Sequence, residues 1–133
     1  MRREVRKYIE SELRHYRDNR NEISLIREDL VQRSTSGDQN RSSEISDPTA
    51  KNAEKLLTNR RLKKLEETVR AIEIVVEELD EDRRRLIEYA YFKRPRTLTD
   101  VGVARKIGVS NRTYYRWRDW IIYRIGEEMG LAD

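Results

Sequence analysis

The chain has no cysteine at any of its 133 positions. Disulfide bonds and thiolate metal sites are therefore excluded, and a reducing compartment fits this composition. No segment approaches the roughly 20 apolar residues that a membrane-spanning helix needs. The first residues are charged and are not followed by an apolar segment, so the pattern is not that of a secretory signal. These absences favour a cytoplasmic protein without a membrane partner.

Charged side chains are abundant and unevenly distributed. They make up 41% of the chain, against 36% hydrophobic residues, a balance typical of long, solvated helices. From Arg83 to Arg124 there are twelve Arg or Lys residues and three acids, a net charge of +9. The other residues carry 17 basic and 22 acidic groups, a net charge of −5, so the whole chain has +4. A basic module joined to an acidic body indicates a polyanionic partner.

The hydrophobic periodicity is helical, and no useful stretch alternates as a β-strand would. The predicted fold class is therefore all-α. Residues 1–33 have apolar positions at helical spacing on both sides of the polar cluster 18–21, which predicts an N-terminal helical hairpin. Residues 34–46 are nearly all polar and show no period, which predicts a flexible linker.

A long amphipathic helix is predicted for residues 47–79. Asp47 can cap it, and Pro48 occupies the first helical position, where its missing N–H costs nothing. From Leu62 to Leu79, apolar residues recur every three or four positions. This stripe fits a two-stranded coiled coil, and it fits equally packing on the chain's own helices. The coiled-coil interpretation implies a homodimer.

Residues 80–133 are predicted to form a separate domain. Its first helix begins at the acidic residues 80–82, which suit the positive end of a helix dipole, and ends at Pro95. Its residues expected to face a core are Leu86, Ile87, Tyr89, Ala90 and Phe92. The stretch from Thr97 to Asp133 then provides two more helices.

These last two helices match the requirements of a helix-turn-helix. Ala104 provides the small residue that lets the second helix cross close to the first, and Gly108 can adopt the positive φ that the turn needs. Thr99 and Ser110 can cap the two helices. The residues expected to face inward are Val103, Ile107, Val109, Tyr114 and Trp117.

Helical periodicity then separates two sets of DNA-contacting residues. The start of the second helix is the part that enters the major groove, where Arg can read guanine and Asn adenine. The predicted base-reading residues are Asn111, Arg112, Thr113, Tyr115 and Arg116. The predicted DNA-backbone contacts, which position a protein without reading sequence, are Arg94, Arg96, Thr99, Arg105, Lys106, Ser110 and Arg118.

The chain resembles the RinA/ArpU family of phage transcriptional regulators. The resemblance rests on the Asp-Pro-Thr start at 47–49 and on the Arg-Thr-Tyr-Tyr-Arg-Trp-Arg segment at 112–118, and it covers most of the chain. Residues from Leu79 to about Leu131 are also similar to the promoter-reading helix-turn-helix of sigma factors. The resemblance implies an activator of late or packaging genes in the bacterial host, with RNA polymerase as a further partner.

Two other function classes can be compared with this one. A small terminase subunit also joins a basic helix-turn-helix to an oligomerising helical body, although its DNA-binding module usually comes first in the chain. An enzyme is disfavoured, because the sole histidine, His15, has no recognisable catalytic partner. The acids Asp80, Glu81 and Asp82 could bind a metal, but helix capping explains them more simply. The chain is therefore expected to be no enzyme and to need no cofactor or metal.

Overall fold

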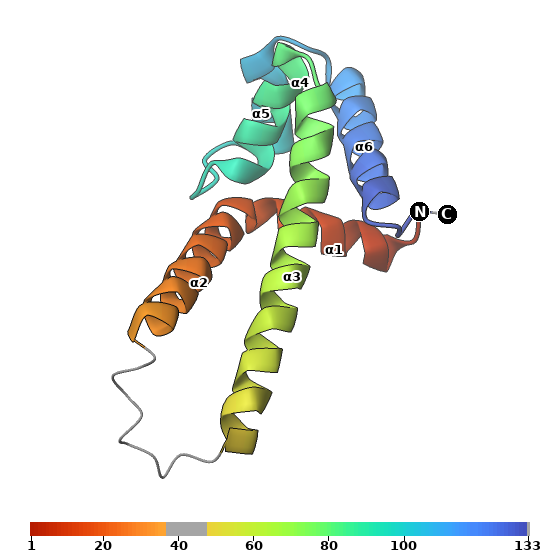
Figure 1. The fold of residues 1–133 in the computed structure, drawn as a ribbon. Coiled ribbons are helices and arrows are strands. Elements are labelled where there is room, and N and C mark those ends of the chain that lie inside the picture. The colour runs from red at the N-terminus through yellow and green to blue at the C-terminus, as the bar shows by residue number, and fades with distance from the viewer. Residues whose placement is uncertain (37–47, 133) are drawn as a thin grey trace. The chain divides into compact units, whose positions relative to one another are not determined.

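The computed structural model describes residues 1–36 and 48–132. This part of the chain consists of α-helices and one short π-helix, η2, and contains no strand, which confirms the all-α prediction (Figure 1). None of its helices has an apolar stretch that could cross a membrane. The elements are α1 (Arg3–Arg14), α2 (Tyr16–Ser36), α3 (Pro48–Glu78), α4 (Glu81–Ile87), η2 (Glu88–Phe92), α5 (Asp100–Ile107) and α6 (Asn111–Glu128).

The helices form two compact units that divide the chain differently from the sequence-based domains. One unit contains residues 1–17 and 68–133, and the other contains residues 18–67. Helix α1 belongs to the first unit because its apolar face packs on α6 and η2, and Ile9 and Leu13 are fully buried there. The predicted N-terminal segment 1–33 is thus divided between the two units at residue 17.

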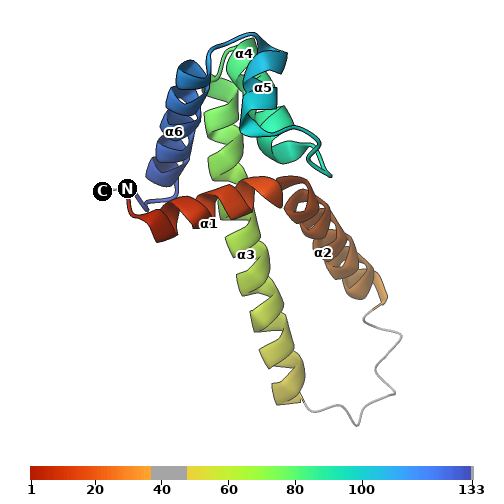
Figure 2. The ribbon, with the colours of Figure 1, turned by 180° about the vertical axis from the view of Figure 1, so that it is seen from behind.

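The contact between α1 and α6 depends on a glycine. A Cβ atom at Gly126 would lie 3.2 Å from Cδ1 of Ile9 and 2.7 Å from Cε of Met1. The absence of a side chain lets the start of α1 run close beside the end of α6 (Figure 2). A small residue such as Gly126 allows two helices to approach each other this closely.

The break between α1 and α2 lies at His15, before the polar cluster 18–21 where the sequence pattern placed it. Tyr16, just after the break, is 8% exposed and stacks on Phe92 with ring centroids 4.5 Å apart. Its hydroxyl group donates to Glu73 at 2.6 Å. The polar cluster 18–21 does not break the helix, because its residues lie within α2. The break lies instead where the chain changes direction and buries Tyr16.

Helix α3 has 31 residues and begins at Pro48, as predicted, whereas the proposed cap Asp47 lies outside the described residues. Ile72, Val75 and Leu79 are buried within the first unit, so the C-terminal turns of the stripe pack on the chain's own helices. The predicted linker 34–46 is helical up to residue 36, and its remainder also lies outside the described residues.

The next helix starts as predicted, because the Asp80 carboxylate accepts a hydrogen bond from the Arg83 N–H at 2.9 Å. The final turn of this helix is the π-helix η2, in which the backbone N–H of Lys93 donates a hydrogen bond to the backbone carbonyl group of Glu88, five residues earlier. A π turn contains one more residue than an α turn and so shifts the following side chains around the axis. As a result Tyr91, which was not predicted to be in the core, is 2% exposed, and Tyr89 is only half-buried.

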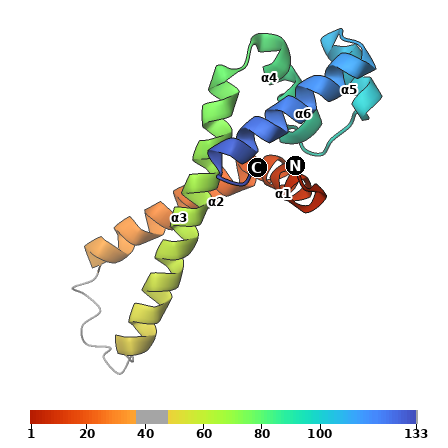
Figure 3. The same cartoon turned by 90° about the vertical axis from the view of Figure 1, so that its right-hand side faces the viewer.

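The helix-turn-helix expectation is met in its local details. The Thr99 and Ser110 hydroxyl groups accept hydrogen bonds from backbone N–H groups three residues later, which caps α5 and α6. Gly108 has φ = 78° and ends α5, and Ala104 is 1% exposed at the helix crossing. Helix α4 packs against both α5 and α6, completing a small core (Figure 3).

Gly108 offers a direct test of this turn. Nothing lies within 4 Å of a Cβ built there, so Gly108→Ala should destabilise the protein by about 1–2 kcal/mol through the left-handed backbone alone. Gly108→Asn should lose less, because Asn tolerates this conformation. Urea unfolding measures the difference. Gly102→Ala is the control, since its backbone is helical, and it should leave stability unchanged or raise it. Equal stability of Gly108→Ala and wild type would contradict the proposed turn.

Candidate nucleic-acid interface

The first two turns of α6 present the face predicted to read bases. Asn111, Arg112, Tyr115 and Arg116 are exposed. Thr113 is half-buried, and its side-chain oxygen accepts a hydrogen bond from the Ser110 hydroxyl at 3.0 Å, next to the helix cap. The structure therefore brings four of the five predicted base-reading residues together on an open surface.

The inward face of α6 is shifted from the predicted one. Tyr114 is 1% exposed, as expected, but Trp117 is only half-buried. The Arg83 guanidinium lies over the Trp117 ring, 5.1 Å from its centroid. The adjacent Arg118 is turned inward instead, with 18% of its side chain exposed. Trp117 is thus not a core residue, and Arg118 occupies the buried stripe between Tyr114 and Ile121.

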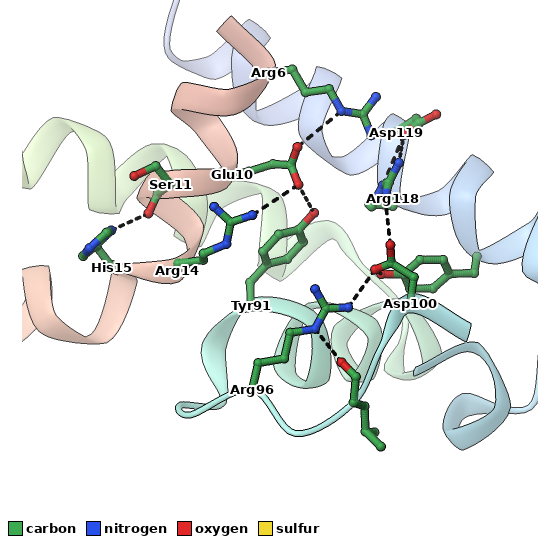
Figure 4. A network of polar contacts seen from close by, with 12 residues as sticks. Arg6, Glu10, Ser11, Arg14, His15, Tyr91, Arg96, Asp100, Arg118 and Asp119 are labelled. Atoms are coloured by element: carbon green, nitrogen blue, oxygen red, sulfur yellow. Dashed lines mark hydrogen bonds and ion pairs between the residues drawn. The ribbon is translucent and has the colours of Figure 1, made fainter. Parts of the chain in front are cut away.

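Arg118 can occupy this stripe because Asp100 and Asp119 neutralise it. Its guanidinium nitrogens lie 3.5 Å from the Asp100 carboxylate and 3.3 Å from that of Asp119 (Figure 4). Buried charges are tolerated when they are paired and hydrogen-bonded. Arg118 was predicted to contact the DNA backbone, whereas in this structure its guanidinium is paired with two carboxylates of the protein.

Asp100 is the centre of the polar network. It accepts hydrogen bonds from Arg96 and from the Tyr114 hydroxyl group, each at 2.7 Å. Burial raises the pKa of this carboxyl, but the two hydrogen bonds and the positive charges of Arg96 and Arg118 lower it more. The pKa of Asp100 therefore lies below its ordinary value, and the carboxylate stays charged at neutral pH. Arg96, also a predicted backbone contact, is committed to Asp100 and to the carbonyl group of Leu98.

The same network continues to the N-terminal helix. Arg6 lies 2.6 Å from the Asp119 carboxylate and also pairs with Glu10. Glu10 accepts a hydrogen bond from the Tyr91 hydroxyl group at 2.9 Å. Burial and the negative charge of Glu10 raise the pKa of Tyr91. Polar contacts thus link α1, η2, α5 and α6 around the helix-turn-helix (Figure 4).

Other basic residues of the +9 region also serve the fold. Arg84 donates to carbonyl groups of Val76 and Glu77 at the end of α3, where a cation suits the helix dipole. Arg85 donates to the Lys106 carbonyl group, and Arg124 pairs with Glu78 and Glu128. The net charge counted from the sequence therefore overstates the charge available to a ligand.

Six exposed basic residues remain available, and we name them the open cation set. None of them forms an ion pair with another described residue, although the ammonium groups of Lys93 and Lys106 lie 5.7 and 5.9 Å from the Tyr89 ring centroid. Sequence reasoning omitted Lys93, although its place beside Arg94 in a basic run was visible. The set consists of Lys93, Arg94, Arg105, Lys106, Arg112 and Arg116.

The start of α6 adds to this positive surface. Its first turn contains no acidic residue, so no carboxylate competes for the positive end of the helix dipole. The predicted backbone contacts Thr99 and Ser110 lie at the starts of α5 and α6, with their oxygens engaged as caps. Within the described ranges, no group of three or more His, Asp or Glu residues could hold a metal ion. The surface therefore suits a polyanion held by guanidinium, ammonium and backbone N–H groups.

Asp100→Asn tests the polar network through its pH dependence. Because the folded pKa is lowered from the 3.8 of a free carboxyl, the charged form stabilises the fold above that pH, and this contribution disappears as pH falls through the folded pKa. Asp100→Asn should therefore have a lower urea midpoint than wild type at pH 7, and the gap should close in strong acid. Glu127→Gln, a change at an exposed carboxylate, is the control. A gap that stayed constant with pH would contradict the proposed role of Asp100.

The chain was compared with known proteins and structures. No curated protein and no solved structure is significantly similar to it. One family model matches residues 5–127, which covers most of the first unit, the whole second unit and the whole candidate interface. The chain therefore belongs to the family described as Protein of unknown function (DUF722).

Proposed function

We propose that the protein binds duplex DNA sequence-specifically through α5 and α6 and acts as a transcriptional regulator. The observation that carries this proposal is the exposed start of α6, where Arg112 and Arg116 have no partner among the described residues. The other four members of the open cation set lie outside this helix, on α5 and in the segment after η2. This arrangement separates groups that can read bases from groups that can hold phosphates.

Duplex DNA fits this surface better than a generic polyanion. An α-helix enters the major groove, and an arginine fork can donate two hydrogen bonds to the O6 and N7 atoms of guanine. Arg112 and Arg116 are four residues apart and thus neighbours on one helix face. Asn111, also exposed, has the amide that pairs with adenine. Lys106 and Arg105 on α5 are suited to phosphate contacts, which fix the register of the protein on the duplex.

The regulatory part of the proposal is supported by the sequence resemblance. Similarity to the RinA/ArpU regulators and to the sigma-factor helix-turn-helix favours activation of phage late or packaging genes, with RNA polymerase as an additional partner. The family to which the chain belongs is described without an activity. The DNA-binding part of the proposal rests on α5 and α6 alone and is independent of this resemblance.

DNA binding should depend steeply on salt. With about −0.9 per neutralised phosphate, the four members of the open cation set outside α6, eight in a dimer, predict a slope of log K against log salt of roughly −4 to −8. Arg112→Ala and Arg116→Ala should melt like wild type and lose about 1–3 kcal/mol of binding, chiefly at one base pair. Lys106→Ala should weaken binding to all sequences and flatten the slope by about one unit. Fluorescence anisotropy with selected and scrambled duplexes measures both effects.

Arg124→Ala is the matched control for these variants. It removes an arginine from the same helix, but this arginine is paired with Glu78 and Glu128, so the salt slope should change little. If affinity for duplex DNA stayed flat from low to physiological salt, the proposed function would be wrong. If Arg112→Ala and Arg116→Ala melted early instead, the assigned face of α6 would be wrong.

The proposal includes a homodimer formed through the unit of residues 18–67. Within the described chain, the four most exposed large apolar side chains lie in this unit, with 59–65% of each exposed, whereas Ile23 and Leu65 are its only buried ones. Most of the stability of helices in proteins comes from packing of an apolar face and not from intrinsic propensity. Ion pairs between Arg61 and Glu22 and between Arg27 and Glu66 join the two helices of this unit within one chain, so the exposed apolar side chains are what a second copy would cover. The exposed residues are Leu25, Val31, Leu56 and Leu57.

Sedimentation equilibrium of the double variant Leu56→Glu/Leu57→Glu tests the dimer. Wild type should sediment as a dimer at micromolar concentration, and the variant as a helical monomer, because two charges replace apolar surface at the contact. Lys55→Ala, a neighbouring exposed substitution, should remain dimeric. A monomeric wild type would refute this interface, and a ring of many subunits would favour a small terminase subunit.

A further inference from the structure

Tyr115 differs from the other residues on the reading face of α6 because its ring is apolar and fixed in place. It is 38% exposed. The neighbouring Tyr114 ring meets it edge-on, with centroids 5.2 Å apart and planes at 74°. The Arg118 guanidinium carbon lies 4.9 Å from the Tyr115 centroid. Both contacts are favourable geometries for an aromatic ring.

The groups that hold the ring are themselves fixed. Tyr114 is 1% exposed, and its hydroxyl group donates to Asp100. Arg118 pairs with Asp100 and with Asp119. If this guanidinium swung out to a phosphate, it would give up both carboxylate partners, whereas Asp100 would keep Arg96 and Asp119 would keep Arg6. Arg118 therefore supports Tyr115 from inside the protein.

The ring lies among the candidate base-reading side chains. Arg112 precedes Tyr115 by three residues and Arg116 follows it directly, so the ring and the Arg112 side chain are neighbours on the helix surface. Asn111, Arg112 and Arg116 offer polar groups to a base edge. Of the two predicted readers with an apolar surface, Tyr115 is exposed, whereas Thr113 is half-buried and its oxygen is engaged beside the helix cap. In the major groove, the C5-methyl group of thymine is the apolar feature of the base pairs.

We propose that the Tyr115 ring reads the C5-methyl group of a thymine, and that Arg118 is the residue that positions this ring. The inference rests on the proposed DNA binding and specifies which feature of the DNA the exposed aromatic contacts. The guanidinium groups of Arg112 and Arg116 read hydrogen-bonding groups beside it. The target site therefore contains a thymine next to a base pair that one of these arginines contacts.

Replacement of single thymines by deoxyuridine tests the contact, because it removes only the methyl group. The probe is the duplex selected from random sequences by the full-length wild-type protein. Removal of one methyl group should weaken wild-type binding about fourfold at one thymine in each half-site, the effect of one buried CH₂ group. Tyr115→Ala should bind the two duplexes equally. Tyr115→Phe should keep the fourfold preference, because the ring and not the hydroxyl makes the contact.

Arg118→Lys tests the positioning role while conserving the charge. It loses the planar group that lies over Tyr115, so the preference for the methyl group should fall below twofold while the salt slope stays at the wild-type value. Arg105→Ala should do the opposite, flattening the slope by about one unit and keeping the preference. Circular dichroism melting verifies that each variant is folded. Should Arg118→Lys unfold, the two Tyr115 variants decide the methyl contact by themselves.

The outcomes separate this inference from the proposed function. A wild-type protein that selects no duplex sequence would refute DNA reading and this inference with it. A wild type that selects a sequence but responds to no missing methyl group would overturn the thymine contact alone. Weaker binding of Tyr115→Phe to both duplexes alike, with an unchanged salt slope, would mean that the neutral hydroxyl group contacts a phosphate instead.

Discussion

The arrangement of the candidate interface depends on the placement of Arg118 beside Asp100. A guanidinium on the buried stripe of α6 requires carboxylates within reach, and Asp100 at the start of α5 provides one. The same carboxylate accepts the Tyr114 hydroxyl group and Arg96. One acidic side chain therefore connects both helices of the motif to the segment before it. Removing Asp100 would leave Arg118 with Asp119 as its remaining carboxylate and would take from Arg96 its carboxylate partner.

This use of charge changes how the basic region should be understood. Half of its twelve basic residues stabilise helix ends, carbonyl groups, carboxylates or tryptophan rings, and the other half form the open cation set. Most residues in both groups are arginines, so the residue type does not separate the two groups. Five members of the first group have a carbonyl or carboxylate acceptor within reach in the folded chain, and the sixth, Arg83, lies over two tryptophan rings. Net charge from sequence indicates the class of partner, whereas the folded structure indicates which charges can meet it.

Features set by nearest neighbours along the chain were predictable from sequence. The caps at Thr99 and Ser110 and the left-handed Gly108 follow from local chemistry, and all three are found. The features that could not be predicted depend on distant contacts. Tyr16 stacks on Phe92 and moves the helix break to His15, and a π turn places Tyr91 in the core instead of Tyr89. Trp117 and Arg118 exchange their expected environments because Asp100 and Asp119 are within reach of the arginine.

The packing of α1 on α6 also has a consequence for biosynthesis. Ile9 is synthesised 117 residues before its partner Gly126. At about 5–20 residues per second, the apolar face of α1 waits roughly 6–23 seconds for this partner. During that interval the packing of α1 on α6 cannot form, because α6 is not yet fully synthesised. The nascent chain thus carries an uncovered amphipathic helix, which is the kind of surface that chaperones bind.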